Sequence, residues 1–279
     1  MRNWCAAIGR MSEVAAATVL LHEEAGLRSP SGLVYDEGTQ TVTIVDMGNR
    51  RLLCFDLKKR GLSSVCPAVP GWRPLAAAMA AGGLAVTDVE SNDIWIRRKE
   101  RWRKAIASEG LAPPLHLPGS IAGDRLGNWY FTDFHNNRIC MQKDGRSSVL
   151  EEIDCVKPYG LCLWKERLYV TDTGRGRILC CDLRHHRCRV EVKGEARFFP
   201  IAVAADSSGD LYISTARRIF LYRSSYRRLE LILDAAAWER LRPEKLGHIG
   251  ALACLPESGL LFTDTVRNAL YHLRVDKFI

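Results

Sequence analysis

The sequence lacks any run of 18 apolar residues, so it offers no candidate transmembrane helix. Its N-terminus also lacks the unbroken apolar core and the small-residue cleavage site of a secretory signal. The first twelve residues carry Arg2 and Arg10 but no acid, as mitochondrial presequences do, yet they are too few to show an amphipathic helix. We therefore expect an intracellular protein, with the cytoplasm favoured over mitochondria.

Cysteine is too sparse for a small disulfide-stabilised scaffold, with ten residues in a chain of 279. Several stand in apolar, strand-like runs, where a thiol behaves as a small hydrophobic group: Cys54, Cys140, Cys162 and Cys254. This usage favours a reducing compartment. The P-loop, the glycine-rich dinucleotide fingerprint and the Gly-x-Ser-x-Gly elbow are also missing, so nucleotide and serine-hydrolase chemistry have no support.

Acidic residues are fewer than basic ones, with 32 Asp and Glu against 40 Lys and Arg and a formal net charge of +8. This excess favours an acidic partner, either an acidic protein or a nucleic acid. With 47% hydrophobic and 26% charged residues, the chain has the composition of an ordinary folded protein.

A repeat of about 40 residues organises the chain. In each unit a Pro or His precedes small and apolar residues, and an apolar run then ends on Asp or Thr. The six pairs are Pro30 with Asp46, Pro74 with Asp88, Pro118 with Asp133, Pro158 with Asp172, Pro200 with Thr215, and His248 with Asp264. Four short strands per unit at this period are typical of a propeller blade, so we predict a single all-β domain, a six-bladed β-propeller.

The blade boundaries follow from the repeat. We expect an N-terminal extension (1–16) and a propeller (17–279) with a helical insertion at 235–246. The sixth unit has only three strands, and an open ring would expose sheet edges, so residues 17–22 are predicted to supply the fourth strand beside 269–275. Removing residues up to Met11 should then cost little. The blades span about 28–66, 72–110, 116–153, 157–194, 198–234 and 248–279 with 17–22.

The turn after the second strand has a recurring sequence. It reads Asp46-Met-Gly-Asn-Arg-Arg51, Asp133-Phe-His-Asn-Asn-Arg138 and Asp172-Thr-Gly-Arg-Gly-Arg177. This signature, with its Pro-x-Gly/Ala lead-in, resembles that of the NHL-repeat β-propellers. We expect the Asp to accept backbone N–H groups of the turn, Gly or Asn to take the positive-φ position, and the Arg to lie across the neighbouring blade. These Asp residues are therefore predicted to be structural.

The resemblance implies an enzymatic alternative, because some similar propellers are metal-dependent lactonases or lyases whose metal is held at the channel mouth by Glu, Asp, Asn or several His. Of the seven His here, only His248 is expected near the start of an inner strand, and the inner runs are small and apolar. We therefore predict no catalytic residue, no metal ligand, no cofactor and no small-molecule substrate.

A possible zinc ligand set in the segment 180–188 is also disfavoured. Cys180 and Cys181 are adjacent in a predicted strand and so point to opposite faces of the sheet. The alternative is a hairpin with one buried thiol.

Two basic surfaces are candidate partner sites. The signature turns should place a ring of side chains on one rim, where Arg could contact phosphates and Phe134 could stack on a base: Arg50, Arg51, Phe134, Arg138, Arg175, Arg177, Arg217, Arg218 and Arg267. Blade two interrupts this ring with Asp88, Glu90 and Asp93. On the opposite rim, a hairpin combines Trp with a dense basic run suited to docking an acidic protein: Arg97, Arg98, Lys99, Arg101, Trp102, Arg103 and Lys104.

The sequence thus favours a non-catalytic propeller that acts as a protein-interaction scaffold, a subunit of a larger assembly. The alternatives left open are an RNA-binding propeller that uses the arginine rim and a metal-dependent hydrolase or lyase.

Overall fold

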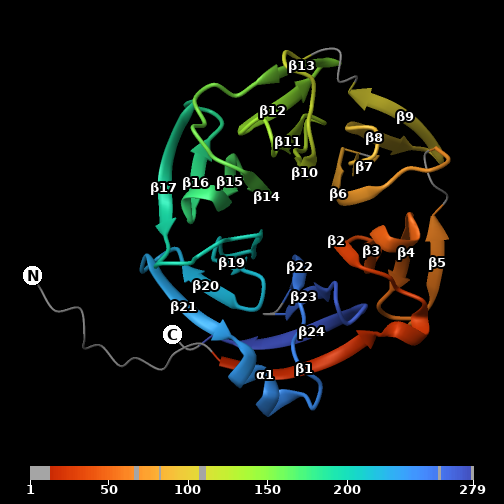
Figure 1. The fold of residues 1–279 in the computed structure, drawn as a ribbon, viewed down its shortest axis with the longest axis vertical. Helices are drawn as coiled ribbons and strands as arrows, with labels where there is room; N and C mark the ends of the chain where they lie inside the picture. Colours follow the sequence, from red (N-terminus) through yellow and green to blue (C-terminus); the bar gives the residue numbers. More distant parts are fainter. Residues whose placement is uncertain (1–12, 66–68, 82, 107–110, 257–258, 278–279) are drawn as a thin grey trace, which may run out of the picture.

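The computed structural model describes residues 13–65, 69–81, 83–106, 111–256 and 259–277. In Figure 1 six four-stranded antiparallel sheets stand around a central axis, which confirms the predicted six-bladed β-propeller. The N-terminal part of the chain lies beside its C-terminal strand in one sheet. The extension expected before residue 13 lies outside the described residues.

The blades follow one another along the chain, each running from an inner to an outer strand. Blade one holds β2 (Pro30–Asp36), β3 (Thr41–Asp46), β4 (Arg51–Asp56) and β5 (Leu62–Val65). Blade two holds β6 (Pro74–Ala80), β7 (Gly83–Asp88), β8 (Asp93–Arg98) and β9 (Arg101–Ile106). Blade three holds β10 (Pro118–Gly123), β11 (Trp129–Asp133), β12 (Arg138–Lys143) and β13 (Arg146–Val149).

The second half repeats this order. Blade four holds β14 (Pro158–Trp164), β15 (Arg167–Asp172), β16 (Arg177–Asp182) and β17 (Arg187–Lys193). Blade five holds β18 (Ala202–Ala205), β19 (Leu211–Ser214), β20 (Ile219–Arg223) and β21 (Arg228–Leu233). Blade six holds β22 (Ile249–Leu255), β23 (Gly259–Asp264) and β24 (Ala269–Asp276), and β1 (Glu13–Leu21) adds the outer strand.

The ring is closed by β1 and β24, which pair antiparallel with Ala17 opposite Leu273 and Val19 opposite Tyr271. The closing strand predicted at 17–22 is therefore present, but it starts four residues earlier, so residues 13–16 belong to the sheet and not to an extension. His22 lies just beyond it and caps a short 3-10 helix, η1 (Glu23–Ala25).

The expected helical insertion contains α1 (Ala235–Leu241), which lies beside β1 in Figure 1. Asp234 caps it by accepting the N–H of Ala237 at 2.8 Å. Trp238 is fully buried and packs edge-on against Phe262 and Tyr271 of blade six. The helix therefore seals the core between blades five and six. No helix in the described part of the chain is long and apolar enough to cross a membrane.

A hydroxyl in the second strand accommodates a bulge in the inner strand of each of four blades, two, three, four and six. The pairing register shifts just after the lead-in residue, for example between Pro158 and Leu161. The freed backbone N–H donates to a buried hydroxyl, as Gly160 does to Thr171 at 2.6 Å. The equivalent acceptors are Thr87, Thr132 and Thr263. A buried backbone N–H without an acceptor would be costly, so a hydroxyl at this position stabilises each of these four bulges. In blade five Ser214 accepts the N–H of Ala202 at 3.2 Å, although the pairing register there is regular.

The segment 180–188 forms the expected hairpin with a buried thiol, Cys180, and it also contains a disulfide that the sequence analysis did not predict. Cys181 of β16 and Cys188 of β17 are directly opposite one another and are bonded, with their Cα atoms 4.0 Å apart. Cys180 is buried on the other face of the sheet, as the strand alternation predicts.

Candidate functional site at the channel mouth

The six inner strands enclose a narrow central cavity of about 90 Å³. At the end nearest the signature turns, its lining comes from the residue after the lead-in proline of blades one to five and from Gly250 of blade six: Ser31, Leu75, Gly119, Tyr159, Ile201 and Gly250. All of the lining residues are described, and none of them is Asp, Glu or His. The channel itself therefore offers no acid, base or metal ligand.

The signature turns are built around buried ion pairs. Asp46, Asp133 and Asp172 are fully buried, and each lies opposite an Arg at the start of the third strand. The Arg Nε atoms lie 2.6–2.8 Å from the carboxylates: Arg51 to Asp46, Arg138 to Asp133 and Arg177 to Asp172. Each Arg also donates to a carbonyl of the segment that leads into its own blade. The expectation that these Arg lie across the neighbouring blade is therefore wrong.

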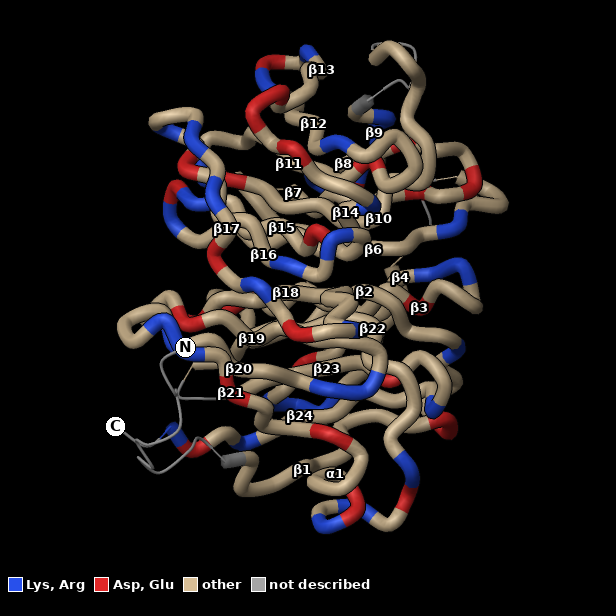
Figure 2. The backbone as a smooth tube through the Cα atoms, turned by 60° about the vertical axis from the view of Figure 1, so that its left-hand side comes forward, with Lys and Arg blue, Asp and Glu red and all other residues tan. Residues whose placement is uncertain are grey.

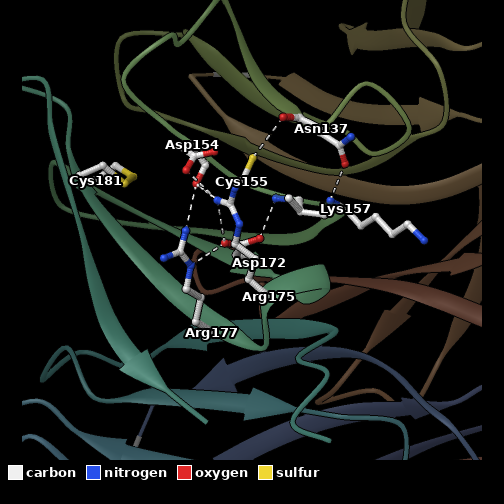
Figure 3. A network of polar contacts seen from close by, with 10 residues as sticks. Asn137, Asp154, Cys155, Lys157, Asp172, Arg175, Arg177 and Cys181 are labelled. Carbon is white, nitrogen blue, oxygen red and sulfur yellow. Dashed lines mark hydrogen bonds and ion pairs between the residues drawn. A yellow bond between two sulfur atoms is a disulfide. The ribbon is translucent and has the colours of Figure 1, made fainter. Parts of the chain in front are cut away.

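The positive-φ position of the turn agrees with the expectation of Gly or Asn in four blades and differs in one. Asn92, Asn137, Gly176 and Asn268 occupy it, whereas blade one has Arg50 with a φ of 54°. The Asn side chains also join consecutive blades. The amide oxygen of Asn137 accepts the N–H of Lys157 at 2.8 Å, as Figure 3 shows, and Asn92 and Asn268 do the same for Leu117 and Ser29.

The remaining arginines of the predicted rim are mostly engaged as well. Arg175 binds the carboxylate and the carbonyl of Asp154 (Figure 3), Arg50 donates to Gly71 O, and Arg267 donates to Lys245 O. Arg217 and Arg218 are exposed, and no hydrogen bond or ion pair of their side chains is seen within the described residues. In Figure 2 basic and acidic segments alternate along the loops. The structure therefore does not gather these arginines into one free cationic surface.

Blade three differs from the others at this rim. Its signature turn carries Phe134 and His135, and the imidazole rings of His135 and His116 lie with their centroids 4.4 Å apart. The ring of Phe134 contacts two other rings, with its centroid 5.1 Å from that of His135 and 5.8 Å from that of Tyr159. Because Tyr159 lines the channel, the four rings form a continuous aromatic surface from the rim to the channel mouth.

The backbone explains why these histidines meet. Blades one and four have Gly48 and Gly174 two residues after the Asp, where a Cβ atom would come within 2.6 Å of the Arg28 or Val156 side chain. Blade three has His135 at this position. Its N–H donates to His116 O at 3.2 Å, and the N–H of His116 donates to the Asp133 carboxylate at 2.8 Å. The turn therefore fixes both rings against each other.

The two histidines are available for proton transfer. Both are exposed, and in the described part of the chain neither ring takes part in a hydrogen bond or ion pair. Burial raises the pKa of the neighbouring Tyr159, so its phenol stays neutral and can donate a hydrogen bond. An imidazole pair beside an aromatic surface can hold an apolar molecule and move a proton to or from it.

The sequence analysis missed both histidines because it considered only His248 to lie close to an inner strand. His248 is half-buried in blade six, one residue further along than the place that corresponds to His116, and its N–H donates to the Asp264 carboxylate at 3.1 Å. Position relative to the signature Asp is the signal that could have found His116 and His135. Of the predicted residues, only Phe134 belongs to this cluster.

Cysteine nucleophiles are not supported by the structure. Burial raises the pKa of Cys140 and of Cys155 to about 12 and that of Cys162 to about 11. A thiol must ionise to attack, so these cysteines act as core residues.

The basic hairpin lies on β8 and β9, away from the channel mouth. Several of its residues are committed to contacts: Lys104 pairs with Asp93 at 2.8 Å, Arg97 pairs with Glu100, and Trp102 packs edge-on against Trp72. Arg98 and Arg103 line a cavity of about 600 Å³ beside blade three. Lys99 lies in the turn with a positive φ, and Arg101 is exposed. The hairpin is therefore an outer edge of blade two in which several of the basic and aromatic side chains already have partners within the chain.

Several solved structures share this fold, although no family profile and no curated protein sequence matches the chain. A gluconolactonase from Xanthomonas campestris superposes with a TM-score of 0.75 at 15% identity, covering 97% of this chain and 96% of that one. Virginiamycin B lyase from Staphylococcus aureus gives a TM-score of 0.63 at 15% identity over 89% and 81%. A chain of a nidogen/laminin complex gives 0.68 at 18% identity over 81% and 84%.

These likenesses contradict two predictions made from the sequence, that the chain is a non-catalytic scaffold and that it is not an enzyme. The gluconolactonase and the lyase are enzymes by name, and a further lyase structure is of a catalytically inactive variant with quinupristin. Both predictions rested on missing ligands in the channel and did not consider the histidine pair outside it. At these identities the comparisons show that the chain is a β-propeller.

Proposed function

We propose that this chain is an enzyme of the lactonase or lyase type whose active site lies at the channel mouth beside blade three. The observation that carries the proposal is the contact between His116 and His135, two exposed imidazoles with centroids 4.4 Å apart. The enzymes among the structures of the same fold support this class of reaction. The signature turns also support placing the chain with the NHL-repeat propellers.

The pair suits the opening of a cyclic ester by acid–base catalysis. In hydrolysis, one neutral imidazole takes a proton from the attacking water and the other, protonated, gives a proton to the departing alkoxide. In elimination, the base removes a proton from carbon, the alkyl C–O bond of the ester breaks, and a C=C double bond and a carboxylate form with no added water. Both reactions balance without a further reactant.

The aromatic surface would orient the substrate. The channel cavity of about 90 Å³ is too small for a ligand of ordinary size, so the substrate would lie across the mouth on Phe134 and Tyr159. The neutral phenol of Tyr159 is a hydrogen-bond donor that could bind a carbonyl oxygen.

The metal site that the resemblance implies for a lactonase does not fit the side chains present. Among the described residues no group of three or more His, Cys, Asp or Glu is gathered for a metal, and the signature carboxylates are already bonded to Arg and backbone N–H groups. We therefore assign the proton transfers to the two imidazoles.

A substrate screen tests the proposal. Purified protein is incubated at neutral pH with aliphatic lactones, aryl lactones and cyclic depsipeptides, and products are read by mass spectrometry. Hydrolysis adds one water to the mass, whereas elimination leaves the mass unchanged and creates a double bond. Turnover that is lost in His116→Gln and kept in His185→Gln, an exposed histidine on the outer hairpin of blade four, supports the site. Absence of turnover across the three classes would overturn it.

A further inference from the structure

Blade two departs from the ion-pair pattern of the signature turn. The residue directly opposite the signature Asp is Arg in blades one, three and four, but in blade two Asp88 lies opposite Asp93. Both are buried, with exposed fractions of 1% and 3%. Like charges directly opposite on neighbouring strands destabilise a sheet, so this pair requires a compensating positive charge.

Asp88 has its ordinary partners. Its carboxylate accepts the N–H of Arg73 at 2.8 Å, the N–H of Glu90 at 3.0 Å and the hydroxyl of Ser91 at 2.8 Å. Only one of the two carboxylate oxygens of Asp93 has a partner among the described residues. Lys104 reaches its Oδ2 at 2.8 Å, but Oδ1 is buried and has no hydrogen-bond partner. A buried ionised oxygen without a partner is strongly unfavourable.

Nearby residues replace only part of the missing guanidinium. In blades one and four that Arg also donates to a carbonyl of the lead-in segment, Gly26 O or Asp154 O. The corresponding carbonyl in blade two, Gly71 O, accepts instead from Arg50 of blade one. Arg50 thus replaces that Arg at the carbonyl, and Lys104 pairs with Oδ2. Oδ1 of Asp93, a residue directly opposite Asp88, is left without a hydrogen-bond partner in the described part of the chain.

We propose that Asp88 and Asp93 form a cation site, in which a hard metal ion binds Asp93 Oδ1 in the place where other blades hold an arginine. The available donors are carboxylate oxygens, which suit Ca²⁺ or Mg²⁺ rather than a thiolate-preferring metal. Ca²⁺ fits best because it tolerates irregular geometry and completes its coordination with water. The ion would neutralise the like-charge pair and join the second and third strands of blade two.

Calcium binding and thermal unfolding test this site with three variants. Asp93→Arg restores the pairing of the other blades, Asp93→Asn removes the charge with little change in shape, and Asp56→Asn is the control at a strand end of blade one. In wild type and in the control, Ca²⁺ at about tenfold excess over its Kd should raise Tm by about 3–5 °C, and calorimetry should give one ion per chain. Mg²⁺ should act more weakly.

Both Asp93 variants should lose the calcium shift, and Asp93→Arg should have a higher Tm than wild type in EDTA. The site is overturned if wild type binds no Ca²⁺ at millimolar concentration, because the oxygen is then satisfied by water or a proton. It is equally overturned if Asp93→Asn binds as wild type does. Neither result depends on the proposed enzyme activity.

Discussion

The imidazole of His135 packs against that of His116, with ring centroids 4.4 Å apart, where blades one and four carry glycine and leave no room for a side chain. The contact joins two segments 19 residues apart and places two proton carriers beside the channel. Blade three thus departs from blades one and four at the position where we propose that catalysis occurs.

The buried ion pairs should dominate the stability of the signature turns. Arg138→Ala leaves the fully buried Asp133 carboxylate without its ion-pair partner, and we expect a loss of about 3–5 kcal/mol in the free energy of unfolding. Denaturant unfolding measures this. Arg218→Ala, on the exposed turn of blade five, should stay within about 0.5 kcal/mol of wild type. Equal effects of the two changes would refute the structural role.

Closure by β1 predicts a sharp dependence on where a truncated chain begins. A chain starting at Glu13 keeps all of β1 and should unfold in one cooperative transition. A chain starting at His22 lacks β1 and exposes the edge of β24, so it should aggregate or unfold at a much lower temperature. Size-exclusion chromatography and scanning calorimetry distinguish the two. A monomeric, equally stable shorter chain would show that β1 is dispensable.

Removing a hydroxyl that holds an inner-strand bulge should lower the free energy of unfolding. Thr132→Val keeps the side-chain shape but leaves the N–H of Ser120 and the carbonyl of Tyr159 without this partner, for a loss of about 1–3 kcal/mol. Blade one has Val45 at this position, beside the bulge at Gly32. Val45→Ala, which removes methyl groups only, provides the comparison by urea unfolding. If Thr132→Val were neutral, the hydroxyl would have no role in holding the bulge.

His272 of β24 should make the protein less stable in mild acid. Burial lowers its pKa below the ordinary value of about 6.5, so the unfolded chain binds the proton more readily than the folded one. Stability should therefore fall as the pH drops below about 6.5, and the loss is complete once the pH lies below the folded-state pKa. In His272→Gln, the free energy of unfolding should vary less between pH 7 and pH 5. An unchanged slope would mean that other groups control it.

The fold could be predicted because the same sequence pattern recurs in each of the six blades. Six lead-in residues and six strand ends, spaced by about 40 residues, identify the blades, and the three-stranded last unit implies a closing strand. The positive-φ asparagines also follow from local turn chemistry. The start of β1 at Glu13 was missed because the alternating pattern of that strand is weak in its alanine run.

The candidate site was less accessible from sequence. The contact of His116 with His135 depends on a loop approaching the signature turn, and no short-range pattern encodes it. The bond between Cys181 and Cys188 similarly depends on hairpin register. The unpartnered oxygen of Asp93 could not be predicted without knowing the strand register and the burial of blade two. The sequence did show that Asp88, Glu90 and Asp93 interrupt the basic rim.

The most direct test of the central claim is the steady-state kinetics of His135→Gly on a cyclic ester that the wild type opens. Glycine is the residue of blades one and four at this position, so the turn should keep its structure and its Tm. We expect kcat to fall by about 10²–10⁴-fold with KM little changed, the effect of removing a proton-transfer group. Retention of wild-type kcat in this variant, with the fold intact, would contradict the assignment of the histidine pair as the catalytic centre.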